Sequence, residues 1–184
     1  MKRIALLVLG LSLVSSAAWA QAPAADFETA LIPAPANLKE AATVIKWKPD
    51  YTYDTLKKGT NTLVCFDRTN LALPGAPAID AECTSLSNLA RVAQNLKFEA
   101  EPDRAKRQAA LDAAEKDGSR VKPEYGSVWY HARGADKNNV RRHTTVAVPG
   151  ATAASTGIPD NPKQGGIWIM DAGTSTAHLM IPGF

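Results

Sequence analysis

The sequence predicts an α+β domain, in which a mostly antiparallel sheet carries a helical insertion, at about residues 84–117, packed on one side. Two observations lead to this fold class. Short segments rich in β-branched and aromatic residues, bounded by Pro and Gly, occur near both ends of the chain. Between them the apolar residues recur at helical spacing instead. Strands are expected at 43–47, 60–66, 127–131, 141–148, 166–170 and 177–181.

The insertion is expected to contain two helices. The first begins at a capping residue, Thr84 or Ser85, and carries a single apolar stripe that faces the sheet. The second follows Pro102 and covers 103–117, a stretch of strong helix formers. Because Leu111 is the only large apolar residue in this second helix, it should pack shallowly at the surface.

The C-terminal third is expected to complete the sheet. Residues 166–170 form a continuous apolar run, which is typical of a strand buried on both faces. The six residues 171–176 suit a hairpin connection between the last two strands. The segment 149–166 holds three Pro and four Gly, and we interpret it as a mobile surface loop, with a functional loop as the alternative.

The first 20 residues are expected to be a secretory signal peptide. Lys2 and Arg3 precede an apolar run of 11 residues, which is too short to span a bilayer comfortably and therefore disfavours a membrane anchor. Residues 18–20 read Ala-Trp-Ala, so cleavage is expected after Ala20. The mature chain would then have an exposed Ala/Pro-rich lead-in over 21–36, a single domain over 37–184, and no transmembrane segment.

The charge balance gives no reason to expect a nucleic-acid partner. The whole chain has a formal net charge of +3. Lys2 and Arg3 belong to the predicted signal peptide, and removing two of the 21 basic residues leaves 19 against 18 acidic ones. A mature chain that is nearly neutral offers no electrostatic case for binding nucleic acid or an anionic membrane.

Cys65 and Cys83 are the only cysteines, and an exported protein with two cysteines favours a disulfide. The bond would close a loop of 17 residues and stabilise the fold by about 3 kcal/mol. The alternative is Cys65 as a catalytic thiolate with a histidine partner. An oxidising compartment argues against this alternative, since it would trap the thiolate.

All three histidines, His131, His143 and His178, fall on predicted strands. If the strands pair, His143 and His178 could lie on one face and bind Zn or Cu as neutral imidazoles. Such a site would need further ligands, and the spacing matches no established metal motif. The simpler interpretation is that each histidine is half-buried and hydrogen-bonded. Further ligands could come from Met170, Met180, Asp171 or Asp67.

Ser175 and His178 raise the hypothesis of a Ser/His hydrolase, with Asp171 as the orienting acid. The sequence has no nucleophile elbow, and six connected loop residues rarely provide the rigid geometry of a triad. Hydroxyl groups that satisfy a hairpin turn are the simpler interpretation.

The tryptophans and two arginines have open interpretations. Trp47, Trp129 and Trp168 lie on three predicted strands, where they could line an aromatic groove or, as is commoner, fill the core. Arg141 and Arg142, beside His143, could bind an anion or protect a solvated strand edge.

Four segments together resemble an uncharacterised family of exported bacterial proteins. These are KKGTNTLVCFDR at 57–68 with the following IDAECTSL, then RRHTTVAVPG, GGIWIMDAGT and the ending AHLMIPGF. The sequence departs from the family pattern at 66–68 and at 144–145. The resemblance implies an exported location and a fold, but no reaction. It marks Gly59, Thr60, Asn61, Cys65, Cys83, His143, Met170, Gly173, Thr174, His178 and Pro182.

The leading functional hypothesis is therefore a disulfide-containing protein, periplasmic or secreted, that acts as a non-catalytic binding or envelope-associated module. Its partner would be a small molecule or an envelope ligand. The alternatives are a metal-binding protein or metal-dependent enzyme using His143 and His178, and a hydrolase using Ser175 and His178.

Overall fold

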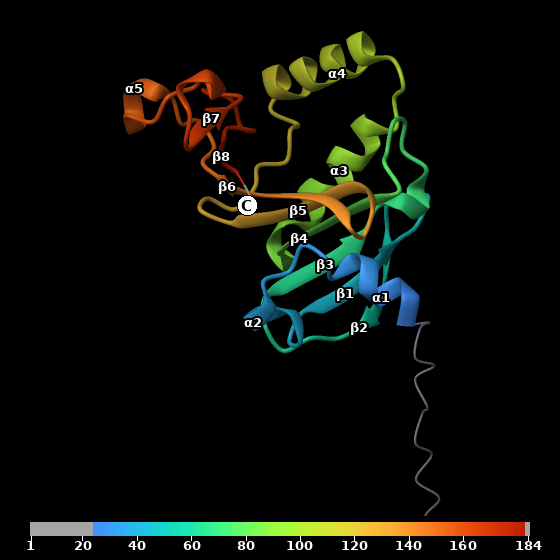
Figure 1. Ribbon diagram of the computed structural model, residues 1–184. Helices are drawn as coiled ribbons and strands as arrows, with labels where there is room; N and C mark the ends of the chain where they lie inside the picture. Colours follow the sequence, from blue (N-terminus) through green and yellow to red (C-terminus); the bar gives the residue numbers. More distant parts are fainter. Residues whose placement is uncertain (1–23, 183–184) are drawn as a thin grey trace, which may run out of the picture.

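The computed structural model describes residues 24–182, and its centre is a single eight-stranded sheet with the order β2-β1-β3-β4-β5-β6-β8-β7 (Figure 1). Only β1 and β3 pair in parallel, and every other pair of neighbours is antiparallel. This confirms the predicted α+β class. The strands are β1 (Thr43–Trp47), β2 (Tyr53–Lys57), β3 (Leu63–Asp67), β4 (Ile79–Ser85), β5 (Val128–Asp136), β6 (Asn139–Ala147), β7 (Trp168–Met170) and β8 (His178–Pro182).

The helical insertion is present as α3 (Leu89–Glu99) and α4 (Arg104–Asp117). The backbone N–H groups of Ala105 and Lys106 donate to the side chain of Asp103, which caps the start of α4. Ala114 is the only buried residue of α4, as expected for a helix that packs shallowly. The other helices are short: α1 (Ala24–Ala30), α2 (Ala36–Lys39) and α5 (Ala153–Thr156).

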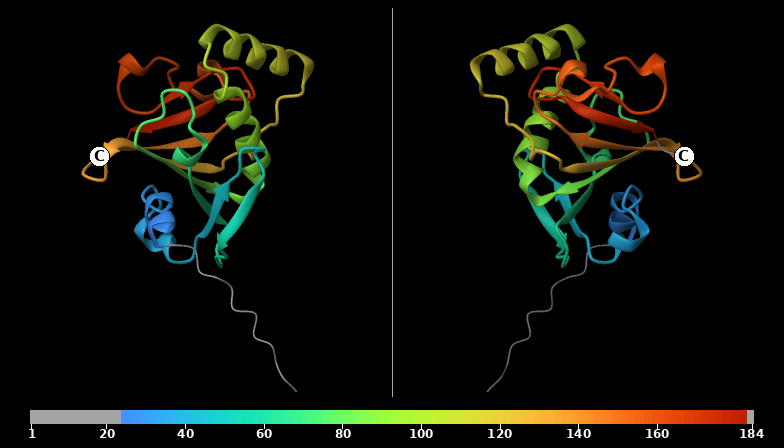
Figure 2. Two further views of the ribbon diagram at one scale, coloured as in Figure 1. Left: turned by 90° about the vertical axis from the view of Figure 1, so that its right-hand side faces the viewer. Right: turned by 90° about the vertical axis from the view of Figure 1, so that its left-hand side faces the viewer.

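The two faces of the sheet are covered by different parts of the chain (Figure 2). On one face α3 packs into the main core, which includes Trp47, Phe66, Leu96 and Trp129. On the other face the N-terminal segment, through Leu31, Ala34 and Leu38, covers a smaller core around the disulfide. A third cluster joins Val148, Ala151, Ile169 and Ala177. It lies in the C-terminal lobe, which we define as residues 148–182.

The predicted disulfide between Cys65 and Cys83 is confirmed. The two cysteines are direct partners across the antiparallel pair β3–β4, and both are fully buried. The bond therefore fixes the register of two central strands beneath the N-terminal segment.

Several expectations about the elements were wrong. The lead-in was expected to be exposed, yet Ala30 and Pro33 are buried against the sheet, because the second core needs an apolar cover. Strand β7 lies at the edge of the sheet, so of its residues only Ile169 is buried and Met170 is exposed. No strand was predicted between residues 47 and 60 or between 66 and 127, yet these segments contain β2 and β4, respectively.

The Gly-Thr-Asn segment has a structural role at the start of β1. Thr60 and Asn61 both donate their backbone N–H groups to the carbonyl of Ala41. A side chain on Gly59 would place its Cβ 2.2 Å from the same carbonyl oxygen, so only glycine allows this approach. The predicted signal peptide lies outside the described residues. Within 24–182, no helix is long and apolar enough to cross a membrane.

Candidate functional site

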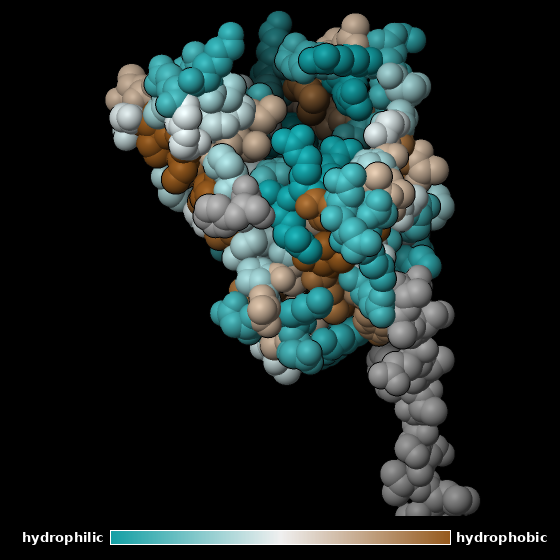
Figure 3. Space-filling model, viewed as in Figure 1, coloured by the Kyte–Doolittle hydropathy of each residue, from teal (hydrophilic) through white to brown (hydrophobic). Residues whose placement is uncertain are grey.

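A cavity of about 280 Å³ lies between α3 and the strands β5, β6, β7 and β8. All three histidines line it, as do Arg91 and Asn95 of α3. The apolar part of its wall includes Trp129, Met170 and Met180. In Figure 3 the surface is recessed between the C-terminal lobe and α4, with hydrophobic residues at the bottom of the recess.

The strand register brings these side chains to one face of the sheet. His131 lies directly opposite His143, and Trp129 lies opposite Thr145 on the same pair of strands. On the next strand, Met180 is opposite Thr145 and His178 is opposite Ala147. Because side chains alternate between faces, residues two apart on each strand point into the same space under α3.

The imidazoles of His131 and His143 form a stacked pair. Their ring centroids are 4.4 Å apart, and the two planes differ by 7°. Burial, followed by the neighbouring His131, lowers the pKa of His143 to about 4. His143 is therefore neutral at pH 7 and presents a flat, uncharged ring to the cavity.

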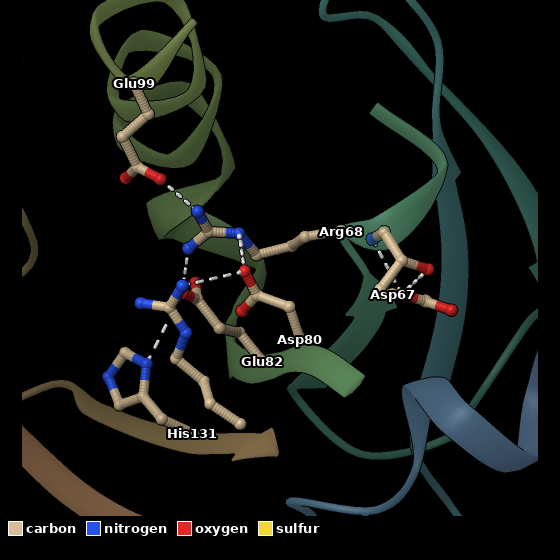
Figure 4. A network of polar contacts seen from close by, with 8 residues as sticks. Asp67, Arg68, Asp80, Glu82, Glu99 and His131 are labelled. Atoms are coloured by element: carbon tan, nitrogen blue, oxygen red, sulfur yellow. Dashed lines mark hydrogen bonds and ion pairs between the residues drawn. The ribbon is translucent and has the colours of Figure 1, made fainter. Parts of the chain in front are cut away.

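A buried ion network contacts His131 through Glu82 (Figure 4). Arg68 extends between Glu82 on β4 and Glu99 at the end of α3, and makes ion pairs with both. Asp80 lies 3.9 Å from the guanidinium Nε of Arg68. Burial alone would raise the pKa of Glu82, but Arg68 and His131 together outweigh it and hold that pKa well below its usual range. Glu82 is therefore an anion.

Glu82 also orients the imidazole of His131. The Oε1 atom of Glu82 lies 3.4 Å from Nδ1 of His131. On the other side of the ring, Nε2 lies 3.3 Å from the Thr145 hydroxyl. A carboxylate can only accept, so Nδ1 donates to Glu82 in this arrangement.

Arg91 is the second buried arginine at the cavity, and its surroundings are different. It is 3% exposed. Its guanidinium donates to the carbonyl of Val121 and, at 2.7 Å, to the hydroxyl of Thr176. Among the side chains that the structure describes, no carboxylate lies within ion-pair distance of it. Burial lowers the pKa of Arg91 to about 10, so it remains a cation at neutral pH.

His178 is held by its own loop. Its Nδ1 atom lies 2.7 Å from the carbonyl oxygen of Thr176, which can only accept, so Nδ1 carries the proton. Nε2 is then an acceptor without a partner among the described residues, and His178 lines the cavity. Burial lowers the pKa of His178, which favours this neutral form.

Two residues of the hydrolase hypothesis, Ser175 and Asp171, make hydrogen bonds to partners outside the proposed triad. Both the hydroxyl and the backbone N–H of Ser175 donate to the carboxylate of Glu115 on α4. Asp171 accepts from Thr174 through its backbone carbonyl. Within the part of the chain that the structure describes, Ser175, His178 and Asp171 do not form a hydrogen-bonded triad.

The residues of the metal hypothesis are only partly brought together. Within residues 24–182, no group of three or more His, Cys, Asp or Glu residues is arranged to hold a metal ion. His143 and His178 share the cavity, but His178 pairs with Ala147, four residues along β6 from His143. That spacing is about 14 Å along the strand. Met170 and Met180 line the cavity, whereas Asp67 accepts from Thr69 elsewhere in the fold.

The other candidates are distributed over the fold. Trp47 is core, Trp129 is both core and cavity wall, and Trp168 is half-buried in a separate groove. Arg141 and Arg142 are exposed and line this second groove together with His143. The segment 149–166 contributes nothing to the wall of the main cavity.

Sequence reasoning missed Glu82, Arg91 and the pairing of His131 with His143. A carboxylate on an unrecognised strand gave no signal. Arg91 lies among charged and polar residues of a helix, and the sequence alone does not show that it is buried.

The chain was compared with known proteins at three levels. A scan of protein-family models, a search of curated proteins and a search of solved structures each found no match.

Proposed function

We propose that the protein is an exported, non-catalytic binding module, periplasmic or secreted, that takes a small organic ligand in the cavity beneath α3. One observation carries the proposal. A buried guanidinium without a carboxylate partner in the described structure shares a cavity with two neutral imidazoles and an apolar wall. Ligand sites typically combine a mostly apolar lining with a few fixed polar groups.

The size of the cavity supports a small ligand. Its volume of about 280 Å³ is close to the lower end of small-molecule sites. The polar groups are held in place before any ligand arrives: Arg91 by Val121 and Thr176, and His178 by the Thr176 carbonyl. Pre-organised groups lower the entropic cost of binding.

Binding can be tested by ligand-induced stabilisation. A library of small organic acids, amines and alcohols is screened for compounds that raise the melting temperature of the mature protein. We expect hits whose effect disappears when Met180→Trp fills the cavity, and Leu86→Trp, at an exposed position outside it, is the matched control. A library without hits, or hits that survive in Met180→Trp, would contradict the proposal.

A second candidate function, hydrolysis, is favoured by one observation. Thr145, His131 and Glu82 form a hydroxyl–imidazole–carboxylate series, with contacts of 3.3 Å and 3.4 Å. Thr145 is 6% exposed and lies in the middle of a strand, which favours the binding module instead. An esterase and amidase panel separates the two. Turnover that is abolished in both His131→Gln and Thr145→Val would establish hydrolysis and exclude a non-catalytic module.

Export is supported by the N-terminal segment, by the resemblance to exported bacterial proteins and by the presence of a disulfide. Expression of the full chain in a Gram-negative host, followed by fractionation and mass spectrometry, tests it. We expect a periplasmic or secreted product that begins at Gln21 and contains the oxidised cysteine pair. A cytoplasmic product that retains residues 1–20 would contradict it.

A further inference from the structure

Resting on the proposed function, we infer that the ligand is a monocarboxylate with a flat apolar body, and that its carboxylate is bound by Arg91. The starting point is the donor capacity of this side chain. A guanidinium has five N–H donors, and the observed hydrogen bonds of Arg91 go to one carbonyl and one hydroxyl. Burying a cation without an anion is costly, so an anionic ligand would be bound favourably.

The other buried arginines nearby do not have this property. Arg68 also lines the cavity, but Glu82, Glu99 and Asp80 surround it. Arg120 donates to Gln94 and Asn95, packs on the ring of Phe98, and does not line the cavity. Arg91 is therefore the cation of this cavity whose charge is not matched by an adjacent carboxylate among the described residues.

One of the two carboxylates that act on Arg91 through space is held by other hydrogen-bond partners. Glu115 and Asp171 both favour the charged form of Arg91 through space. Glu115, however, accepts from Ser175 and from the hydroxyl of Thr176, and this fixes the loop that Arg91 contacts. Thr176 thus links Arg91 to Glu115 and holds the guanidinium at the wall.

A second donor lies beside Arg91. Asn95 follows it by one helical turn on α3, so both side chains project from the same side of the helix into the cavity. The amide oxygen of Asn95 accepts from Arg120. Its NH₂ group is therefore directed away from that contact. Among residues 24–182 it has no hydrogen-bond partner, so it is available to a second carboxylate oxygen.

The charge of the cavity favours a single negative charge on the ligand. His143 and His178 are neutral at pH 7, as their lowered pKa values require. Glu82 and Glu99 line the same cavity and would repel a dianion. A carboxylate matches the planar fork of a guanidinium, whereas inorganic phosphate at neutral pH carries more charge than Arg91 can balance.

The remaining wall selects the body of the ligand. Trp129, Met170 and Met180 are apolar, and the stacked His131–His143 pair adds a flat surface. Aromatic rings and thioethers both favour contact with another aromatic ring. A small aromatic carboxylate satisfies the charge, the shape and the volume together.

The test compares benzoate with benzamide, which has a similar shape but no charge, by isothermal titration of the mature protein. Inorganic phosphate is titrated in parallel. We expect the Kd of benzoate to be at least tenfold lower than that of benzamide, and phosphate to bind more weakly than benzoate. In Arg91→Gln the preference for benzoate should disappear, whereas Arg104→Gln, at an exposed position outside the cavity, should retain it.

A second measurement does not depend on the variant folding. In the wild-type protein, benzoate but not benzamide should shift the NMR signal of the Arg91 side-chain Nε–H group. If benzamide binds as tightly as benzoate, or phosphate binds more tightly, the inference is overturned while the cavity remains a ligand site. If none of the three binds and the screen for stabilising compounds also finds none, the proposed function itself fails.

Discussion

Arg68 and Arg91 are both buried at the same cavity, yet they have opposite electrostatic environments. Arg68 makes ion pairs with Glu82 and Glu99, and these carboxylates outweigh burial and raise its pKa. Within the described part of the chain, Arg91 donates only to neutral acceptors, and burial lowers its pKa to about 10. The first arginine therefore belongs to the fold, whereas the second has charge available for a ligand.

Replacing Arg68 should destabilise the protein strongly. Arg68→Met leaves Glu82 buried without its arginine partner, and removing one partner from a buried network costs about 3–5 kcal/mol. Urea unfolding measures the loss. The matched control is Lys48→Met, whose exposed ion pair with Asp54 should contribute less than about 1 kcal/mol. Equal losses in the two variants would contradict the role assigned to Arg68.

His143 should make stability depend on pH. In the unfolded chain it titrates near pH 6.5, whereas in the fold burial and His131 lower its pKa to about 4. As pH falls from 6.5 to 4, the unfolded state binds the proton first, so stability is lost over this range. When the pH is lowered from 7 to 4.5, the free energy of unfolding should fall by about 1–2 kcal/mol less in His143→Gln than in the wild type. This figure allows for the partial exposure of His143.

Chemical denaturation at several pH values measures this difference. His178, whose pKa is lowered by burial, acts in the same direction and is still present in the variant. At pH 8 both histidines are neutral, so that pH provides the reference point. Parallel pH profiles for wild type and variant would show that His143 is not buried as described.

At the scale of elements, a bulge in the β5–β6 hairpin decides which histidines meet. The register shifts between Gly134 and Asp136, so that Gly134 pairs with Val140 but Asp136 pairs with Asn139. Extending the Asp136 pairing without the shift would place Thr144, not His143, opposite His131. The bulge therefore creates the stacked pair at the cavity.

Gly134 permits this bulge. An added Cβ would lie 2.0 Å from the carbonyl oxygen of Asn139, so Gly134→Ala should cost about 2–3 kcal/mol. It should also change the NMR shifts of the His131 and His143 rings. Gly118→Ala is the control: its φ of +77° makes alanine unfavourable by about 1 kcal/mol, but nothing lies within 4 Å. Unchanged histidine signals in Gly134→Ala would contradict this explanation.

The disulfide joins two central strands beneath the N-terminal segment. The double variant Cys65→Ala/Cys83→Ala should lose about 3 kcal/mol, because the unfolded chain regains the freedom of the closed loop. Guanidinium unfolding of the wild type and the double variant measures the difference in free energy of unfolding. Equal far-UV circular dichroism spectra first show that both proteins are folded. A loss below about 1 kcal/mol would mean that the bond contributes little to stability.

The sequence predicted those elements whose patterns are local. The stripe of α3, the extent of α4 and the hairpin that joins β7 to β8 are determined by residues close in the chain. Strand β2 was missed because its residues are mostly exposed and polar, and only pairing with β1 makes it a strand. Strand β4 was missed because Asp80 and Glu82 are charged, and their burial depends on Arg68.

The candidate site was less predictable than the fold. His143 and His178 were identified from their strands, and the structure places both at one cavity. Their distance along the sheet depends on the pairing of β6 with β8, which the sequence does not specify. The burial of Arg91 depends on contacts with residues 30 and 85 positions away in the chain.

For the whole molecule, the two faces of the sheet differ: one is sealed and the other carries the main cavity. The N-terminal segment seals one face over the disulfide, and no part of the main cavity opens there. On the other face α3 covers the core at one end of the sheet. The cavity lies at the other end. There β6, β8 and β7 continue the sheet (Figure 1). The central claim is that this cavity is a ligand site.

Soaking crystals of the mature protein with a library of small organic fragments tests this claim most directly. We predict that fragments collect in the cavity beneath α3, in contact with Trp129 and Met180, and that carboxylates among them lie against Arg91. A cavity that holds only ordered water in every data set, with fragments bound elsewhere, would contradict the account.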